Sequence, residues 1–373
     1  MEKLFEFGKA VSGNTFTDRE KETAKLISNF NYGVNTFMVS PRRWGKTSLI
    51  KKVKGLTENK NLKVVYVDVQ RCRNKEEFCE RLASAVLTQT ANKMEEWMEN
   101  AKDFLSRFSI GVNANPDPIG EMTLKLQLSP KERSIEDFLQ LPERIAQRKN
   151  LRIVVCVDEF QQIGNYTDSL HFQTELRSVW QHHELTSYCL FGSRKHMMEA
   201  LFDDDTKPFY KFGDIMYLPR IPANYWVKYI TDKFKQAEKQ ITRNQALWIV
   251  ERVDGNSSYV QQLSWYVFQR TSRKVSDGIL NEALRELIEQ RNDIFEAKTD
   301  DLTAYQMNFL RAIADGHQTG LSSAEIIQKY HLGSSANVSI IKKSLTDKDL
   351  ILTENKEIFL SDPVMGLWLQ LDQ

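Results

Sequence analysis

Short apolar runs alternate with amphipathic stretches through residues 1–221. Five of these runs are rich in β-branched or aromatic residues and bounded by polar segments, which is typical of strands in a parallel sheet. Segments with helical spacing of apolar residues separate them, so the pattern predicts an α/β fold with a doubly wound, parallel five-stranded sheet. The predicted strands are the apolar run that opens 35–50, then 62–69, 152–158, 187–193 and 214–221.

The chain between the second and third predicted strands is longer than a helical crossover requires. A helix is predicted from about residue 75 to 105. Residues 109–129 then alternate apolar and polar positions on two arms, around a turn at 115–120 that contains Pro and Gly. This alternation predicts a β-hairpin insertion at about 106–130 in the core of the fold.

The C-terminal part of the chain has a helical pattern. Helices are predicted at 224–240, 243–254 and 257–271, the second ending at Gly255. After residue 301, three short helices precede two strands that flank a turn at 354–356, an order typical of a winged helix. Residues 322–325 read as a capping box, and Ser334 or Ser335 caps the third helix. The predicted domains are a P-loop core (1–221), a helical lid (222–300) and a winged helix (301–373).

The junction between the first strand and the following helix has the composition of a phosphate-binding loop. In such a loop the backbone N–H groups and the helix N-terminus face an anion, the lysine reaches the β- and γ-phosphates, and the next hydroxyl ligates Mg²⁺. Lys46 and Thr47 fill these two roles, so we expect ATP and Mg²⁺ to bind here. The predicted loop residues are Ser40, Pro41, Arg42, Arg43, Trp44, Gly45, Lys46, Thr47 and Ser48.

Two features of this loop depart from the simplest pattern. Ser40 stands where the first glycine is usual, and if that position requires positive φ, serine costs about 1 kcal/mol and lowers nucleotide affinity. Arg42 and Arg43 could steer anions toward the loop, or they could pair with nearby carboxylates. The sequence leaves both roles open.

A second site follows the third predicted strand. This strand is apolar until it ends in Asp158 and Glu159, and ligands of open α/β sheets bind at the carboxyl ends of strands. We expect Asp158 to hold Mg²⁺ and Glu159 to orient or deprotonate the attacking water, because phosphoryl transfer to water needs both roles. The sequence thus predicts slow ATP hydrolysis to ADP and phosphate.

Composition limits the choice of partners. Lys and Arg total 51 and Asp and Glu total 50, a formal charge of +1, so no global field attracts nucleic acid or an anionic membrane. No apolar run approaches the ~18 residues of a membrane span and no signal-peptide pattern is present, so we expect a cytoplasmic protein. The four cysteines lack C-x-x-C spacing and are predicted to be reduced and packed.

Several motifs together resemble one family, the archaeal-type ATPases of the STAND branch of P-loop NTPases, relatives of AAA+ and Orc/Cdc6-like proteins. The resemblance covers nearly the whole chain, and the F-x-x-R-E start, the hairpin insertion and the D-P-x-x-x-x-W ending are its more particular features. The motifs are FTDRE (16–20), SPRRWGKTSL (40–49), VCVDEFQQI (155–163), GNSSY (255–259) and DPVMGLW (362–368).

The resemblance implies roles for four further residues. Phe16 and Arg19 would lie against adenine, and Ser193 and Arg194 would sense the γ-phosphate. In the lid motif, Ser258 stands where proline is common in the family, and this departure bears on nucleotide sensing by the lid.

Two classes of function fit these features. The first is a nucleotide-driven switch, in which ATP and ADP change how the winged-helix domain contacts a protein partner or assembles an oligomer. The alternative is an ATP-dependent DNA-binding regulator or replication-initiator-like protein, whose third winged-domain helix enters the major groove. Residues 302–373 have a net charge of −2, which provides little neutralisation of phosphates and favours protein contacts over DNA.

Overall fold

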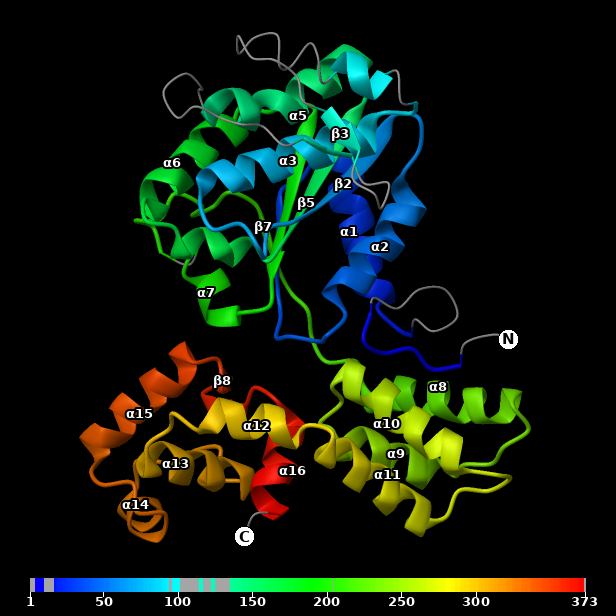
Figure 1. Ribbon diagram of the computed structural model, residues 1–373, viewed down its shortest axis with the longest axis vertical. Coiled ribbons are helices and arrows are strands. Elements are labelled where there is room, and N and C mark those ends of the chain that lie inside the picture. Colours follow the sequence, from blue (N-terminus) through cyan, green and yellow to red (C-terminus); the bar gives the residue numbers. More distant parts are fainter. Residues whose placement is uncertain are drawn as a thin grey trace. The chain divides into compact units, whose positions relative to one another are not determined.

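The computed structural model describes residues 4–9, 17–93, 96–100, 114–116, 122–124, 135–202 and 204–371 (Figure 1). It separates into two compact units. The first consists of Arg19–Ser40 and Lys46–Pro219, and the second of Met1–Asp18, Pro41–Gly45 and Arg220–Gln373. The tip of the predicted phosphate-binding loop therefore groups with the C-terminal half of the chain, whereas both ends of the loop belong to the first unit.

A five-stranded parallel sheet lies at the centre of the first unit (Figure 1), which confirms the predicted fold class. The strand order is β2-β5-β6-β1-β7. All residues of β1 and β6 are buried, as expected for strands covered on both faces. The strands are β1 (Thr36–Val39), β2 (Leu62–Asp68), β5 (Arg152–Asp158), β6 (Thr186–Gly192) and β7 (Asp214–Tyr217).

The carboxyl ends of these parallel strands meet at one edge of the sheet. Ser40 follows β1, Asp158 ends β5 and Ser193 follows β6. Since β6 pairs with both β1 and β5, this edge brings together residues that are more than a hundred positions apart in the chain. Two of the sites predicted from the sequence therefore share one edge.

Helices of the first unit connect the strands. The longest of those described begins at Lys75, and the side chain of Asn74 before it accepts the Glu77 N–H at 2.9 Å and caps the helix. Apolar side chains of this helix, including Phe78 and Leu82, belong to the same hydrophobic core as buried residues of the sheet. The helices are α1 (Glu20–Tyr32), α2 (Lys46–Thr57), α3 (Lys75–Thr90), α5 (Ile135–Lys149), the 3₁₀ helix η2 (Phe160–Asn165), α6 (Ser169–Trp180) and α7 (Lys195–Glu199).

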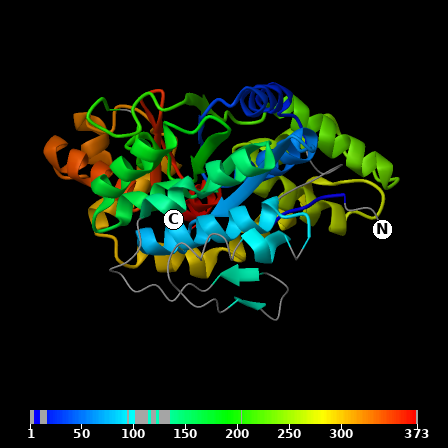
Figure 2. The same cartoon turned by 90° about the horizontal axis from the view of Figure 1, so that it is seen from above.

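Two short strands form a separate antiparallel pair. These strands, β3 (Ala114–Pro116) and β4 (Met122–Leu124), are the teal arrows near the lower edge of Figure 2, and Asn115 lies opposite Thr123. The pair falls within the hairpin predicted from the sequence, and β4 contacts α3. The remainder of the predicted insertion lies outside the described residues.

Before the winged helix, the described part of the second unit contains the three helices predicted for the lid, followed by two further helices. Capping side chains explain several of the helix starts: Thr242 forms a capping box with Gln245, and Asn256 and Ser276 accept backbone N–H groups. Gly255, with φ of +62°, follows the end of the second helix and donates to Val250 O at 2.8 Å. The helices are α8 (Ala223–Gln236), α9 (Arg243–Arg252), α10 (Ser257–Arg270), α11 (Asp277–Glu289) and α12 (Asn292–Thr299).

The winged helix is confirmed, and the structure adds one helix after its hairpin. The two positive φ angles at Asn355 and Lys356 form the tight turn between its strands. Ser334 caps the third helix as predicted, but the predicted capping box at 322–325 is wrong because Ser323 is the capping residue of α14. Its elements are α13 (Ala304–Ala314), α14 (Ala324–Lys329), α15 (Ser335–Asp347), β8 (Ile351–Glu354), β9 (Glu357–Leu360) and α16 (Pro363–Leu371).

The remaining observations on the fold concern the cysteines, Trp368 and the search for membrane-spanning helices. All four cysteines are free and buried, as predicted. Trp368 is buried, packs against Phe295 and donates its indole N–H to Asn292 at 2.9 Å, so it fixes α16 against α12. Within the described ranges, no helix has both the length and the apolar character needed to cross a membrane.

Candidate nucleotide-binding site

The backbone of the predicted phosphate-binding loop is left-handed at two positions. Arg43 has φ of +64° and Gly45 has φ of +90°. Ser40 has no positive φ, so the condition under which serine would be strained at this position is not met. Glycine is well suited to position 45, whereas Arg43 adopts a conformation that costs a non-glycine residue about 1 kcal/mol or more.

Lys46 is the first residue of α2 and is buried, with 6% of the residue exposed. Its ammonium donates to Ser40 O at 2.9 Å and to Ser40 Oγ at 3.2 Å. A glycine at position 40 would offer only the first of these acceptors. Ser40 therefore helps to hold the ammonium at the end of β1, where the sequence predicts phosphate binding.

Oxygen atoms of Asp158, Thr47 and Tyr66 lie close together at the carboxyl edge of the sheet. The Thr47 hydroxyl donates to Asp158 Oδ2 at 3.0 Å, and the Tyr66 hydroxyl donates to the same oxygen at 2.5 Å. Burial is the main cause that raises the pKa of Asp158 above its ordinary value, and it likewise raises the pKa of Tyr66.

The donor set of this cluster fits Mg²⁺. Mg²⁺ prefers hard oxygen ligands, and in phosphoryl-transfer sites one or two protein oxygens suffice because the substrate and water supply the rest. The convergence of a hydroxyl and a buried carboxylate meets that requirement. No group of three or more His, Cys, Asp or Glu residues suited to a metal is present in the described ranges.

Glu159 follows Asp158 with its backbone in the left-handed region, at φ of +56°. Its Oε2 atom accepts hydrogen bonds from Ser193 Oγ at 2.9 Å and from Gln161 Nε2 at 2.5 Å. Its backbone N–H donates to Asp158 Oδ1 at 2.9 Å. The structure thus brings Ser193, predicted as a γ-phosphate sensor, into direct contact with the carboxylate predicted to act on water.

Four further residues were predicted to belong to the nucleotide site, and three of them lie in the described part of the chain. Arg19 is buried and donates to Pro219 O at 2.5 Å. This hydrogen bond joins the first and last residues of the first unit. Arg194 precedes α7 and donates to Met197 Sδ at 3.6 Å. Ser48 is buried on α2. Phe16 lies outside the described residues.

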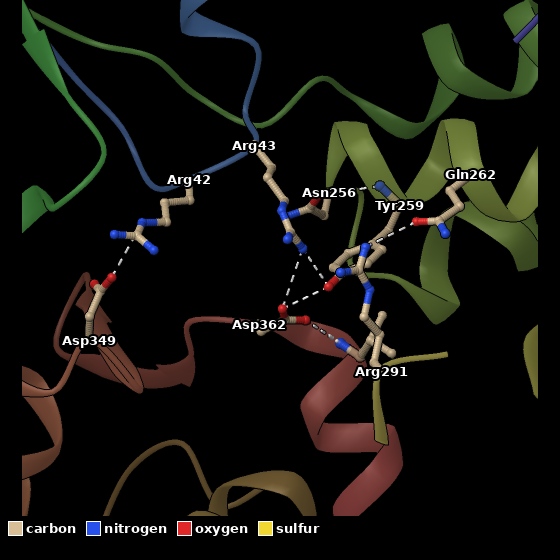
Figure 3. A network of polar contacts seen from close by, with 9 residues as sticks. Arg42, Arg43, Asn256, Tyr259, Gln262, Arg291, Asp349 and Asp362 are labelled. Atoms are coloured by element: carbon tan, nitrogen blue, oxygen red, sulfur yellow. Dashed lines mark hydrogen bonds and ion pairs between the residues drawn. The ribbon is translucent and has the colours of Figure 1, made fainter. Parts of the chain in front are cut away.

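Side chains at the loop tip contact the lid and the winged helix within the second unit (Figure 3). Arg43 donates to the Tyr259 hydroxyl at 2.6 Å and pairs with Asp362 at 3.6 Å. The Tyr259 hydroxyl in turn donates to Asp362 Oδ2 at 2.7 Å, and Arg42 pairs with Asp349 at 3.6 Å. Both loop arginines therefore pair with carboxylates, which is one of the two roles that the sequence left open.

Tyr259 lies at the centre of this network. The guanidinium carbons of Arg43 and Arg291 lie 5.1 and 5.6 Å from its ring centroid. Burial, together with the charge of Asp362, raises the pKa of Tyr259 well above its ordinary value, so the hydroxyl remains a donor. Three motifs from the sequence, in the loop, the lid and the C-terminal segment, meet here.

Sequence reasoning missed two residues of the first site. Tyr66 is a polar-tipped residue within an apolar strand, and Gln161 follows Glu159 by only two positions. Either signal could have been noticed. Asp362 and Tyr259 were part of quoted motifs, but no contact between them was predicted.

Comparison with known families gives two matches. A family model described as an ATPase domain predominantly from Archaea matches residues 16–263, and a model described as a probable winged helix domain matches residues 293–371. No curated protein matches the chain by sequence. The two family matches together span the predicted loop, both carboxylates, much of the helical lid region and the C-terminal domain.

Solved structures with the same fold cover nearly the whole chain. A Walker-type ATPase of Pyrococcus abyssi has a TM-score of 0.70 at 18% identity, covering 99% of this chain and 100% of the other. The ORC2 protein of Aeropyrum pernix, in ADPNP and ADP complexes, has a TM-score of 0.57 at 15% identity, covering 99% of each chain. The ORC1 protein of Aeropyrum pernix in complex with DNA has a TM-score of 0.51 at 12% identity, covering 100% of this chain and 98% of the other.

Proposed function

The chain belongs to the family of ATPase domains found predominantly in Archaea, and from this premise we propose that it is a Mg²⁺-dependent ATPase that acts as a nucleotide-driven switch. Lys46 and the loop N–H groups bind the phosphates of ATP. Thr47 and Asp158 hold Mg²⁺, which neutralises charge on the phosphates. The exchange of ADP for ATP alters how the winged helix contacts a protein partner in the cytoplasm.

Hydrolysis in this proposal uses the carboxylate of Glu159. A water oxygen forms a bond to the γ-phosphorus while the bond to the bridging oxygen breaks, and Glu159 accepts the proton that the water loses. ADP and phosphate are the products. Ser193 contacts Glu159, which supports a role for this serine near the third phosphate.

The switch rests on one observation, the pairing of both loop arginines with acidic residues of the winged helix and its C-terminal helix. ATP brings additional negative charge to the loop, and its phosphates compete with Asp349 and Asp362 for the guanidinium groups. Binding of ATP and release of these carboxylates are therefore coupled, and the coupling acts equally in both directions. A partner that holds the winged helix away from the loop would increase ATP affinity.

The test starts from the parent protein and Lys46→Ala, in titrations with Mg·ATP. We expect the parent to bind and hydrolyse ATP and the variant to lose binding, because the ammonium that contacts phosphate is gone. Since Lys46 is buried and bonded to Ser40, its thermal unfolding is recorded too, and Lys46→Met serves as a variant that keeps the apolar stem. Equal ATP affinity of the parent and a folded variant contradicts the site.

Asp362→Asn tests the switch. Asparagine removes the charge opposite Arg43 but can still accept the Val364 N–H that Asp362 accepts at 3.1 Å, so the start of α16 is preserved. We expect ATP affinity to rise about two- to fivefold, since ATP no longer competes with this charge for Arg43 and a partly exposed ion pair contributes up to about 1 kcal/mol. Asp232→Asn, which breaks an exposed pair with Lys228, is the matched control. Equal ATP affinities of all three proteins contradict the switch.

Direct binding of DNA is a second candidate, and one observation favours it. The outer face of α15 is exposed at Ser335, Ser339 and Lys343, while Val338 and Ile341 face the domain core. The helix that would read DNA is therefore accessible. The acidic balance of residues 302–373 still favours protein contacts.

A further inference from the structure

We propose that Gln161 is a positioning residue for hydrolysis, which orients Glu159 by donating to one of its two carboxylate oxygens. The inference rests on the proposed ATPase function and adds a residue to it. Gln161 lies in η2, two residues after Glu159, and its side-chain amide is buried, with 2% of the residue exposed.

The orientation of the Gln161 amide follows from the chemistry of its neighbour. An ionised carboxylate can only accept hydrogen bonds, so the nitrogen of the amide must face Glu159. The contact of 2.5 Å between Gln161 Nε2 and Glu159 Oε2 has this arrangement. The amide oxygen, Oε1, then points away and is buried without a hydrogen-bond partner in the described part of the chain.

Gly192 provides the space for this oxygen. A Cβ atom placed on Gly192 would lie 1.7 Å from Gln161 Oε1 and 2.8 Å from Gln161 Cδ. The backbone of Gly192 does not have a positive φ, so conformational freedom does not explain the glycine. The last residue of β6 therefore lacks a side chain where the buried amide needs room, directly before Ser193.

The two donors act on the same oxygen. Ser193 Oγ and Gln161 Nε2 both contact Glu159 Oε2, from β6 and from η2. Together they fix the plane of the carboxylate and leave Oε1 of Glu159 as the acceptor for a water proton. The left-handed backbone of Glu159 adds strain at the same residue, as is common where a side chain must be aimed.

Stability alone does not account for this arrangement. A buried amide oxygen without a partner destabilises the fold, and an apolar side chain of similar size would avoid that cost. The glutamine is therefore explained by what its nitrogen does for Glu159. It follows that replacing it should harm the reaction more than it harms the fold.

The test compares Gln161→Met with the parent and with Gln162→Met as the matched control. The side chain of Gln162 donates to Gln70 O at 3.0 Å and does not contact Glu159. We expect Gln161→Met to lower kcat about tenfold or more, with ATP affinity within about threefold of the parent and a thermal midpoint equal or higher. The control should match the parent in all three measurements.

Gln161→Glu gives an independent measurement that a structural role would not affect. Its carboxylic acid has the shape of the amide and donates to Glu159 only when protonated. We expect its kcat, relative to the parent, to be highest at acidic pH and to fall as the pH rises. This variant also decides the matter if Gln161→Met does not fold.

The outcomes separate the inference from the function on which it rests. A parent protein that binds ATP without hydrolysing it overturns both. A parent that hydrolyses ATP, with an unchanged or higher kcat in Gln161→Met, overturns the positioning role alone. Loss of ATP binding in a folded Gln161→Met, or a kcat ratio for Gln161→Glu that does not depend on pH, overturns it as well.

Discussion

At the scale of single residues, Asp158 and Glu159 are adjacent in the chain but have different surroundings. Asp158 is 7% exposed and accepts from Tyr66 and Thr47, whereas Glu159 accepts from Ser193 and Gln161. Burial raises the pKa of Asp158, and the hydrogen bond from Tyr66 opposes this effect. One carboxylate is thus placed among hydroxyls suited to Mg²⁺, and the other between two donors suited to orient it.

The raised pKa of Asp158 predicts that Mg²⁺-dependent nucleotide binding weakens toward acidic pH. Between the unfolded and folded pKa values the folded state keeps a proton that the unfolded state loses. The nucleotide-free protein therefore loses stability as the pH rises through that interval. Over the same interval the Asp158 carboxyl ionises, and the ionised form is the one that binds Mg²⁺. Asp158→Asn should bind Mg·ADP weakly at every pH.

Calorimetric titration with Mg·ADP between about pH 5 and pH 8 would measure this dependence in the parent and in Asp158→Asn. The parent should lose affinity on the acidic side, and the ratio of the two affinities should approach one there. Parallel pH profiles for the two proteins would rule out Asp158 as the titrating group.

Among the site residues, those in local motifs were predictable and their partners were not. Lys46, Thr47 and the two carboxylates follow from spacing within a few positions. Tyr66 depends on the register of β2 against β5: it lies opposite Cys156, so Asp158 is its diagonal neighbour. A register of this kind is fixed by packing across the sheet, and no local pattern reports it.

At the scale of elements, α14 shows how a capping pattern can be displaced by one residue. The Ser323 hydroxyl accepts the Ile326 N–H at 3.4 Å. We expect Ser323→Ala to destabilise the winged helix by about 1 kcal/mol and Ser322→Ala to have little effect. The midpoints of urea unfolding for the two variants provide the measurement, and the reverse order of stabilities would restore the cap that the sequence predicted.

Element boundaries were predicted best where the apolar pattern is regular. The second strand was predicted as 62–69 and ends at Asp68, whereas the fifth was predicted as 214–221 and ends at Tyr217. Prolines follow closely after Tyr217 and cannot donate to a ladder, which explains the shorter strand. The helix α16 was not predicted, although Asp362 before Pro363 is a typical helix start.

At the scale of the whole molecule, a net charge of +1 and an acidic winged helix predict weak binding of DNA. Fluorescence anisotropy of the full chain with duplex DNA should give a slope of log affinity against log salt no steeper than about −3, because few phosphates are neutralised. Reversal of charge at Lys343, the exposed cation of α15, should change the affinity little. Tight binding with a slope near −6 would instead support the DNA-binding alternative.

The sequence predicted the parallel sheet and the winged helix, but not the association of the loop tip with the C-terminal half of the chain. Both folds follow from regular patterns of apolar residues. The contact between Arg43 and Asp362 joins positions more than three hundred residues apart, and it is set by tertiary structure. The sequence of the loop alone was consistent with arginines that steer anions and with arginines that pair with carboxylates.

The bonds between Lys46 and Ser40 also close the base of the phosphate-binding loop. They join the two ends of the segment Pro41–Gly45, whose tip carries Arg42 and Arg43. A phosphate oxygen that attracts the ammonium away from Ser40 would open that base, and the strain at Arg43 could then relax. The arrival of nucleotide would thus be communicated along five residues of backbone, before any phosphate touches the arginines.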